Sequence, residues 1–449
     1  MGHDLSLSFA LFARATHGEP RFAELLRGLR DRGEADFARV EPTVREILSA
    51  VRTEGDAAVL RYVQRFERRQ PVRLCVRDLE GRAALDRLGA AERGALELAA
   101  ARIAAFHEQE RDRMFPGLGE RRAGFDVTAG GRRLGLRVAP LSSVGVYAPG
   151  GKARYPSSVL MSAIPARVAG VGEILLATPL SGVPREDDGV LAAAYLAGVS
   201  AVVDAGGAQA IAALAYGTAA IPRVDKIVGP GNAFVACAKR LVFGAVAIDS
   251  IAGPSEILVL ADETADPAHV AADLLSQAEH DEDAYALLVA SSAELARAVT
   301  DELGRQLASL PRVAIAAESL RRHGHVLVVP DRRTMATVAS AIAPEHLSLQ
   351  VAAPEELLAE IPHVGAAFVG SSTPEAVGDY LAGPSHVLPT GGAARYGAPL
   401  GVHDFVTRTS IIRYTPEALR EDEEPICVLA RLEGLEAHAR AVTVRTRPR

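Results

Sequence analysis

The alternation of short apolar strands with helices is the feature that most limits how this chain of 449 residues can fold. A first series of strand-type and helix-type segments runs from Tyr147 to about Ser250, and a second series follows Ser255. Strands and helices that alternate at this spacing imply right-handed crossovers and a parallel sheet covered by helices on both faces. We therefore predict an α/β fold with two Rossmann-like parallel-sheet modules.

The two ends of the chain have a different character. Residues 1 to about 110 carry apolar residues at three- and four-residue spacing, which predicts helices. Gly130-Gly131 separates two alternating segments and predicts a β-hairpin. After about Ala398 the chain contains the acidic stretch 420–425 and then a helical segment, CVLARLEGLEAHARAV. We expect helical extensions at both ends, the second of which packs on a neighbouring subunit.

These patterns divide the chain into five segments, in which one α/β domain is split in the sequence by the other. The predicted boundaries are 1–41 for an N-terminal helical extension, 42–146 for the first part of α/β domain 1, 147–254 for α/β domain 2, 255–398 for the second part of domain 1, and 399–449 for a C-terminal extension.

Composition excludes several classes of function. Lys plus Arg number 49 against 56 for Asp plus Glu, and there is no Trp, so the basic surplus and stacking platforms of nucleic-acid proteins are lacking. Neither a secretory signal nor a membrane span is recognisable, and we expect a cytoplasmic protein. The three cysteines are far apart and form no CxxC, whereas there are 12 histidines. Any transition metal is therefore expected to have nitrogen and oxygen ligands.

Three glycine-rich turns follow strands of the first module, at 145–156, 204–210 and 228–234. No GxGxxG is present, so both modules are incomplete as Rossmann folds. Glycines at such junctions often do no more than make tight turns. Because three of them meet at the carboxyl edge of one sheet, where α/β proteins bind ligands, we expect a ligand there.

Polar residues gather in three motifs of the second series. In SQAEH, Gln277 and His280 are three residues apart and project from one helical face, which suits two ligands of one metal. In APEHL, a turn after Pro344 would bring Glu345 and His346 into one cleft as an acid/base pair. Each motif taken alone is equally compatible with a helix terminus or a buried polar residue.

The third motif, GDYLAGPSHVLP, places Asp379 seven residues before His386 with a Gly-Pro turn between them. Helix capping by the aspartate and simple burial of the histidine would also explain this pattern. The motifs HExxH, GxSxG and GxxxxGK[ST] are missing. Residue chemistry alone therefore indicates a metal-dependent nucleotide enzyme and names no reaction.

Long motifs of this chain closely resemble the histidinol dehydrogenase family, in the same order along the sequence. They are GVYAPGGKARYPSSVLMSAIPARVAGV, VDKIVGPGNAFVACAKR, GPSEILVLAD, LLSQAEHD, APEHL, GDYLAGPSHVLPT and DFVTRTS. The resemblance implies oxidation of L-histidinol to L-histidine through histidinaldehyde, the last step of histidine biosynthesis, with two NAD⁺ and one Zn²⁺ per subunit. It also implies a homodimer with a shared active site, without nucleic-acid or membrane partners.

The resemblance also implies roles for individual residues. The implied zinc ligands are Gln277, His280, Asp379 and His438, the last supplied by the partner subunit. The implied catalytic pair is Glu345 and His346. The implied substrate contacts are Ser255, Gln277, His280, His346, Asp379, Tyr380, His386, Glu433 and His438. The implied NAD contacts are Tyr147, Gln209 and Asn232. Domain 2 would thus bind NAD, the second part of domain 1 would carry the metal and catalytic residues, and the C-terminal extension would complete the partner's site.

Three alternatives remain open at this stage. A relative that oxidises another alcohol would lack residues that bind the imidazole and amine of histidinol. Here His386, Glu433 and His438 are all present. A metal-dependent lyase or hydrolase would use the same polar set without NAD. A non-enzymatic scaffold would have no use for clustered polar residues in an apolar α/β body.

Overall fold

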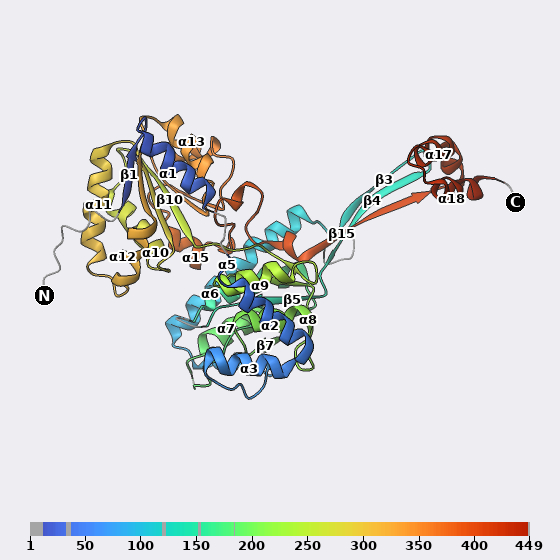
Figure 1. Ribbon diagram of the computed structural model, residues 1–449, viewed down its shortest axis with the longest axis horizontal. Coiled ribbons are helices and arrows are strands. Elements are labelled where there is room, and N and C mark those ends of the chain that lie inside the picture. The colour runs from blue at the N-terminus through green and yellow to red at the C-terminus, as the bar shows by residue number, and fades with distance from the viewer. Residues whose placement is uncertain (1–11, 33–36, 119–122, 151–153, 184, 448–449) are drawn as a thin grey trace.

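The computed structural model describes residues 12–32, 37–118, 123–150, 154–183 and 185–447 of the chain. Figure 1 shows two lobes, each built around a sheet, and an arm that projects away from them and carries helices at its tip. None of the helices within the described ranges is long and apolar enough to cross a membrane.

Lobe 1 is built on six parallel strands. In spatial order they are β1 (Ala13–Thr16), β12 (Gly324–Val328), β11 (Tyr285–Ala290), β10 (Glu256–Ala261), β13 (His346–Gln350) and β14 (Ala366–Val369). The helices of this lobe are α1 (Pro20–Asp31), α10 (Pro267–Ala278), α11 (Ala293–Leu307), α12 (Val313–His323), α13 (Arg332–Ile342), α14 (Pro354–Ala359) and α15 (Glu375–Tyr380). Along β10, Ile257 and Val259 enter one apolar core, and Leu258 and Leu260 enter the other, as expected of a sheet buried on both faces.

Lobe 2 holds the second sheet, which is parallel except for one short edge strand. Its order is β2 (Cys75–Val76), β7 (Ala201–Val203), β6 (Glu173–Ala177), β5 (Ser143–Tyr147), β8 (Lys226–Val228) and β9 (Ala247–Ile248), with β2 antiparallel. One apolar core lies under α2 (Glu41–Glu54), α3 (Asp56–Glu67), α8 (Gly207–Tyr216) and α9 (Ala233–Val242). The opposite core lies under α5 (Ala90–Met114), α6 (Pro156–Ala169) and α7 (Asp188–Ala197), and α4 (Gly81–Arg87) packs on α7.

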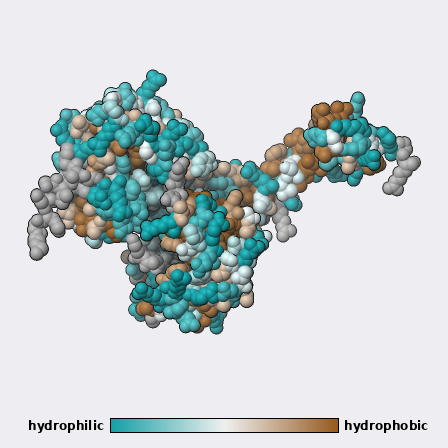
Figure 2. Space-filling model, viewed as in Figure 1, coloured by the Kyte–Doolittle hydropathy of each residue, from teal (hydrophilic) through white to brown (hydrophobic). Residues whose placement is uncertain are grey.

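The arm is a three-stranded antiparallel ribbon with a helical tip. Its strands are β3 (Gly124–Ala129), β4 (Arg132–Pro140) and β15 (Val406–Tyr414), and its helices are α16 (Pro416–Glu421), α17 (Glu423–Leu432) and α18 (Glu436–Thr446). The predicted hairpin at Gly130-Gly131 is confirmed, and both glycines adopt positive φ there. Figure 2 shows apolar surface along the ribbon and at its tip. The exposed apolar side chains there include Phe125, Val127, Ile412, Leu432 and Val444.

A cluster of charges fixes the base of the arm to lobe 2. The Val402 N–H donates to the Glu110 carboxylate (3.1 Å), and Nζ of Lys226 lies 2.7 Å from the Asp404 carboxylate. Burial would raise the pKa of Glu110, but hydrogen bonds from His107 and His403 outweigh it and hold that pKa at about 2. The segment that leads into β15 is therefore held on α5 by hydrogen bonds to Glu110 and on β8 by the Lys226–Asp404 ion pair.

The predicted fold class, α/β with two parallel-sheet modules, is confirmed. The assignment of residues 42–146 to one domain with 255–398 differs from the structure. The apolar faces of α2 and α3 pack against α8 and α9, and β5 begins at Ser143 in the sheet of lobe 2. The N-terminal extension is likewise part of lobe 1, because β1 pairs with β12. Amphipathic periodicity shows that a helix has a buried face, but it does not show which sheet that face meets.

Two local elements also differ from the sequence prediction. The predicted turn around Pro344 is present, but it leads into a strand that was not predicted from the sequence, β13, which lies between β10 and β14. The helical segment expected near the C-terminus is divided into α17 and α18 at Gly434, whose positive φ ends the first helix.

Candidate active site

The predicted catalytic residues lie where two sheet edges meet. The described parts of the glycine-rich turns follow β5, β7 and β8 and so occupy the carboxyl edge of the lobe 2 sheet, as predicted from their spacing, whereas residues 151–153 of the first turn lie outside the described residues. Glu256 and His346 are the first residues of β10 and β13, at the amino edge of the lobe 1 sheet. The chain passes from one edge to the other in the short segment 249–255 between β9 and β10. α/β sheets usually bind ligands at their carboxyl edge, and the predicted catalytic residues of lobe 1 lie instead at the amino edge of their sheet.

The imidazole of His346 is buried and held in one orientation. Its Nδ1 lies 2.9 Å from the Glu256 carbonyl oxygen. Because a carbonyl only accepts hydrogen bonds, this contact places the proton on Nδ1 and leaves Nε2 as an acceptor. Burial lowers the pKa of His346, so the ring is neutral near pH 7. A neutral imidazole with a free Nε2 can act as a general base.

The carboxyl group of Glu345 is also buried and is fixed by the backbone of β10. It accepts a hydrogen bond from the Glu256 N–H (2.8 Å), and it lies 3.6 Å from Nδ1 of His346. Burial raises the pKa of Glu345 well above its ordinary value, and the nearby Glu256 raises it further. A carboxylate with a raised pKa is a stronger base than an ordinary one, which suits proton abstraction from water.

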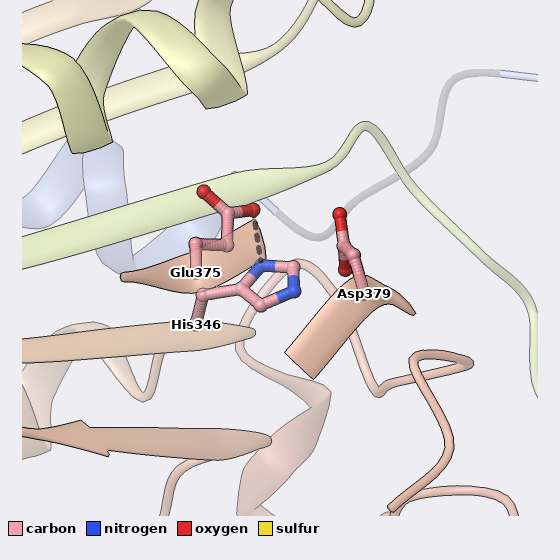
Figure 3. Close-up of side chains that lie close together, drawn as sticks. All are labelled: His346, Glu375 and Asp379. Carbon is pink, nitrogen blue, oxygen red and sulfur yellow. Dashed lines mark ion pairs between the residues drawn. The ribbon is translucent and has the colours of Figure 1, made fainter. Parts of the chain in front are cut away.

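A third acidic residue, Glu375, was not predicted from the sequence. Figure 3 shows the His346 ring between Glu375 and Asp379, and one ligand atom from each residue lies within 4.8 Å of the others. Glu375 and Asp379 are four residues apart on α15, so helical periodicity could have found this pair. Burial raises the pKa of Glu375, and Asp379 raises it further. The arrangement concentrates oxygen ligands beside one imidazole, as a divalent cation requires.

The amide of Gln277 supplies independent support for a bound ion. This residue occupies the last turn of α10 and is fully buried, yet neither its oxygen nor its nitrogen has a hydrogen-bond partner among the described residues. Buried amides are nearly always paired, so an unpaired one marks a position that a ligand completes. The neighbouring Ser276 hydroxyl donates to Glu375 (3.0 Å), which places this end of α10 against α15.

The histidines near Asp379 differ in exposure. His280 lies in the turn after α10, because that helix ends at Ala278, and it is exposed. His386 is mostly buried, and its Nδ1 lies 3.0 Å from the Asp379 carbonyl oxygen. Burial lowers the pKa of His386. Gln277 at the end of α10, His280 in the turn after it, Asp379 near the end of α15 and His386 beyond that helix offer nitrogen and oxygen donors, a set that suits zinc or a similar divalent ion.

The other predicted contacts divide between the site and the arm. Ser255 immediately precedes β10, and Tyr380 ends α15 with an exposed ring. Glu433 and His438 belong to the helical tip of the arm, which Figure 1 shows far from α10 and α15 of the same chain. Gln277 and Asp379 therefore lie on the adjacent helices α10 and α15 of one chain and His280 lies in the turn after α10, whereas the fourth predicted ligand, His438, lies in the arm.

The predicted NAD contacts share one edge of lobe 2 and also shape its turns. The Tyr147 hydroxyl accepts from the Gly207 N–H (3.0 Å), and the Gln209 amide donates to Glu67 (3.3 Å). The Asn232 side chain caps α9 by accepting from two backbone N–H groups. Tyr147 is almost fully buried, so its ring is not an open stacking surface in this conformation.

The last of the three turns requires glycine. Gly229 has a φ of 111°, and a Cβ atom there would lie 2.2 Å from the Tyr147 carbonyl oxygen. Its N–H donates to Asp249 (2.7 Å) and its carbonyl accepts from Nζ of Lys239 (2.9 Å). Because Lys239 and Asp249 are both buried and form an ion pair, the turn has a fixed shape.

Comparison with known proteins identifies the relatives of this chain. A family model described as histidinol dehydrogenase matches residues 30–446. The histidinol dehydrogenase of Syntrophotalea carbinolica is 51% identical over 426 residues, 94% of this chain and 96% of that protein. That of Geobacter sulfurreducens is 48% identical over 435 residues, 96% of this chain and 98% of that protein. The crystal structure of histidinol dehydrogenase from Elizabethkingia anophelis superposes with a TM-score of 0.87 at 31% identity, covering 97% of this chain and 98% of that one.

The geometry of the site predicts how it binds metal. We expect Asp379→Asn to weaken the binding of Zn²⁺ at least about tenfold, because the substitution removes the anionic oxygen beside His346 and His386. Metal content after dialysis, measured by mass spectrometry, checks this. Asp86→Asn, which changes an exposed carboxylate on α4, should leave the content unchanged. Equal metal content in both variants would contradict the site.

Proposed function

Because the chain belongs to the histidinol dehydrogenase family, we propose that it oxidises L-histidinol to L-histidine through histidinaldehyde, the last step of histidine biosynthesis. The enzyme is an NAD-dependent oxidoreductase. The proposal includes two NAD⁺ per turnover and one Zn²⁺ per subunit. The observation that carries it is the joint presence of Asp379, a possible metal ligand that is close to the His346 ring, and the buried amide of Gln277, which has no hydrogen-bond partner among the described residues.

The metal would be held by side chains from two subunits. Gln277, His280 and Asp379 would come from one chain, and the fourth ligand would be His438 of the partner subunit. Bound Zn²⁺ would anchor the imidazole and amine of the substrate. Such anchoring fixes the position and orientation of a small amino alcohol on binding, so less translational and rotational entropy has to be lost in the reaction step itself. His386 and Tyr380, next to Asp379, would contact the same substrate.

The cofactor would lie along the carboxyl edge of the lobe 2 sheet. Tyr147, Gln209 and Asn232 are proposed to form this site, supported by their common position at the ends of β5, β7 and β8. NAD⁺ bound there would accept a hydride from the substrate carbon in each of the two oxidations. The residues that handle protons belong to the facing edge of lobe 1, so each lobe would serve one half of the reaction.

His346 is proposed as the base in both oxidations. Its Nε2 would take the hydroxyl proton of histidinol while the hydride leaves. The Glu256 carbonyl oxygen holds the proton on Nδ1, which keeps Nε2 available for the substrate. The proton would have to leave the imidazole before the second oxidation begins.

Glu345 is proposed to act only in the second stage. Its carboxylate would remove a proton from the water that adds to histidinaldehyde, which gives the gem-diol. His346 would then take a hydroxyl proton of the gem-diol as the second hydride leaves. The raised pKa of Glu345 makes it strong enough as a base for this step.

A homodimer would explain the arm. The apolar side chains exposed on its ribbon and tip are typical of a surface that binds another protein chain. Helices α17 and α18 bury only a small core, around Cys427, Ala430 and Ala439. We propose that the tip packs on a second copy and delivers Glu433 and His438 to the site of the partner subunit.

The division of roles between Glu345 and His346 predicts distinct defects. Glu345→Gln should leave histidinol oxidation within a few-fold of wild type and slow histidinaldehyde oxidation by roughly 10²-fold or more, because only water addition needs that base. His346→Asn should slow both stages. Single-turnover measurements with each substrate separate the stages. Equal loss of both stages in Glu345→Gln would contradict this assignment.

The proposed sharing of ligands predicts complementation between subunits. His438→Asn and His280→Asn homodimers should each be inactive. Heterodimers formed by mixing and refolding should regain up to about half of the wild-type sites, because one of the two sites then has all its ligands. His280→Asn mixed with Asp379→Asn serves as the control, since both changes lie in the same half of the site. No recovery in the first mixture would contradict a shared site.

A further inference from the structure

A buried ion pair between Arg32 and Glu256 contacts the proposed catalytic residues. Arg32 follows α1, and its side chain is only 2% exposed. Its guanidinium binds both carboxylate oxygens of Glu256, with Nη2 at 2.7 Å from Oε1 and Nε against Oε2. The Glu256 side chain is 1% exposed. Two residues separated by 224 positions therefore form a bidentate pair in the interior.

Arg32 also holds the chain that leads into the catalytic pair. Its Nη1 donates to the carbonyl oxygen of Ile342, the last residue of α13, at 3.0 Å. The next residue, Ala343, has a φ of 47°, a backbone conformation that residues other than glycine rarely adopt. Pro344 and Glu345 follow. Arg32 thus fixes the end of the helix from which this strained turn departs.

Glu256 connects the ion pair to the catalytic groups through three hydrogen bonds and accepts a fourth from Gly391. Its Oε1 accepts from the N–H groups of Glu345 and Gly391, both at 3.1 Å. Its own N–H donates to the Glu345 carboxylate (2.8 Å), and its carbonyl oxygen contacts Nδ1 of His346 (2.9 Å). A shift of Glu256 would therefore move both proposed bases.

We propose that Arg32 is a positioning residue that sets the orientation of Glu345 and His346 through Glu256 and through the end of α13. The inference rests on the proposed function. β10 and β13 are already joined by ladder pairs from Ile257 and His346 onward, so the sheet itself is secured without this contact. The contacts of Arg32 concentrate at Glu256 and Ile342, where the strand begins and the helix ends. A misplacement of about 1 Å at such a site can cost about 10²-fold in rate.

The test compares Arg32→Met with Arg27→Met, which changes an exposed arginine on the same helix. Arg32→Met keeps most of the side-chain volume but leaves Glu256 without its cation. The kcat for histidinaldehyde oxidation should fall at least tenfold, with the KM for histidinaldehyde within twofold and one Zn²⁺ retained per chain. Histidinol oxidation should fall less, because the Glu256 side chain binds the backbone of Glu345. Arg27→Met should match wild type in every measurement.

A second variant guards against a failure to fold. Arg32→Lys keeps the charge but can make only a point contact with Glu256, and its kcat should lie between those of wild type and Arg32→Met. Loss of thermal stability or of metal with an unchanged kcat per folded site, in either variant, would overturn the inference. If wild-type protein forms no NADH from histidinol, the proposed function fails. If wild type is active and Arg32→Met equals Arg27→Met, only the positioning role fails.

Discussion

The carboxylate of Glu256, buried at the start of β10, is the constraint on which the proposed site depends. An ionised carboxylate in the interior costs several kcal/mol unless it is paired and hydrogen-bonded. Here Arg32 supplies the opposite charge, and backbone N–H groups of Glu345 and Gly391 supply hydrogen bonds. The carboxylate can therefore be buried only when the N-terminal segment, the turn before β13 and the segment after α15 come together. The same assembly places the His346 imidazole against the Glu256 carbonyl oxygen.

The carboxyl edge of the lobe 2 sheet and the amino edge of the lobe 1 sheet carry different kinds of groups. The carboxyl edge of lobe 2 carries glycine turns whose backbone can approach a ligand closely, and the Lys239–Asp249 pair keeps one of these turns rigid. The amino edge of lobe 1 carries Glu345 and His346, the side chains that we propose bind and release protons. Hydride transfer needs the cofactor on one side of the substrate and the base on the other, and this arrangement suits that need. The arm, held at its base by the charges around Glu110, extends away from its own site with His438 at the tip.

Much of this organisation can be predicted from the sequence, for identifiable reasons. Strand and helix alternation, the Gly130-Gly131 hairpin and the polar motifs around Gln277 and Asp379 are local signals. Strand β13 was missed because its buried positions include Ser348 and Gln350, which are tolerated only because both bind Asp273 of α10. The lobe to which α2 belongs, and the pairing of Arg32 with Glu256, depend on contacts between distant segments, which periodicity does not encode. Glu375 could have been predicted from the sequence, since it lies one helical turn before Asp379.

The number of NADH molecules formed per L-histidinol distinguishes a two-stage oxidation to L-histidine from a single oxidation that stops at histidinaldehyde. Purified protein loaded with Zn²⁺ should be given limiting L-histidinol and excess NAD⁺, and the reaction followed by NADH absorbance to completion. Two NADH per L-histidinol are expected, with L-histidine as the only product. One NADH per L-histidinol with free histidinaldehyde, or no NADH at all, would contradict the two-stage oxidation.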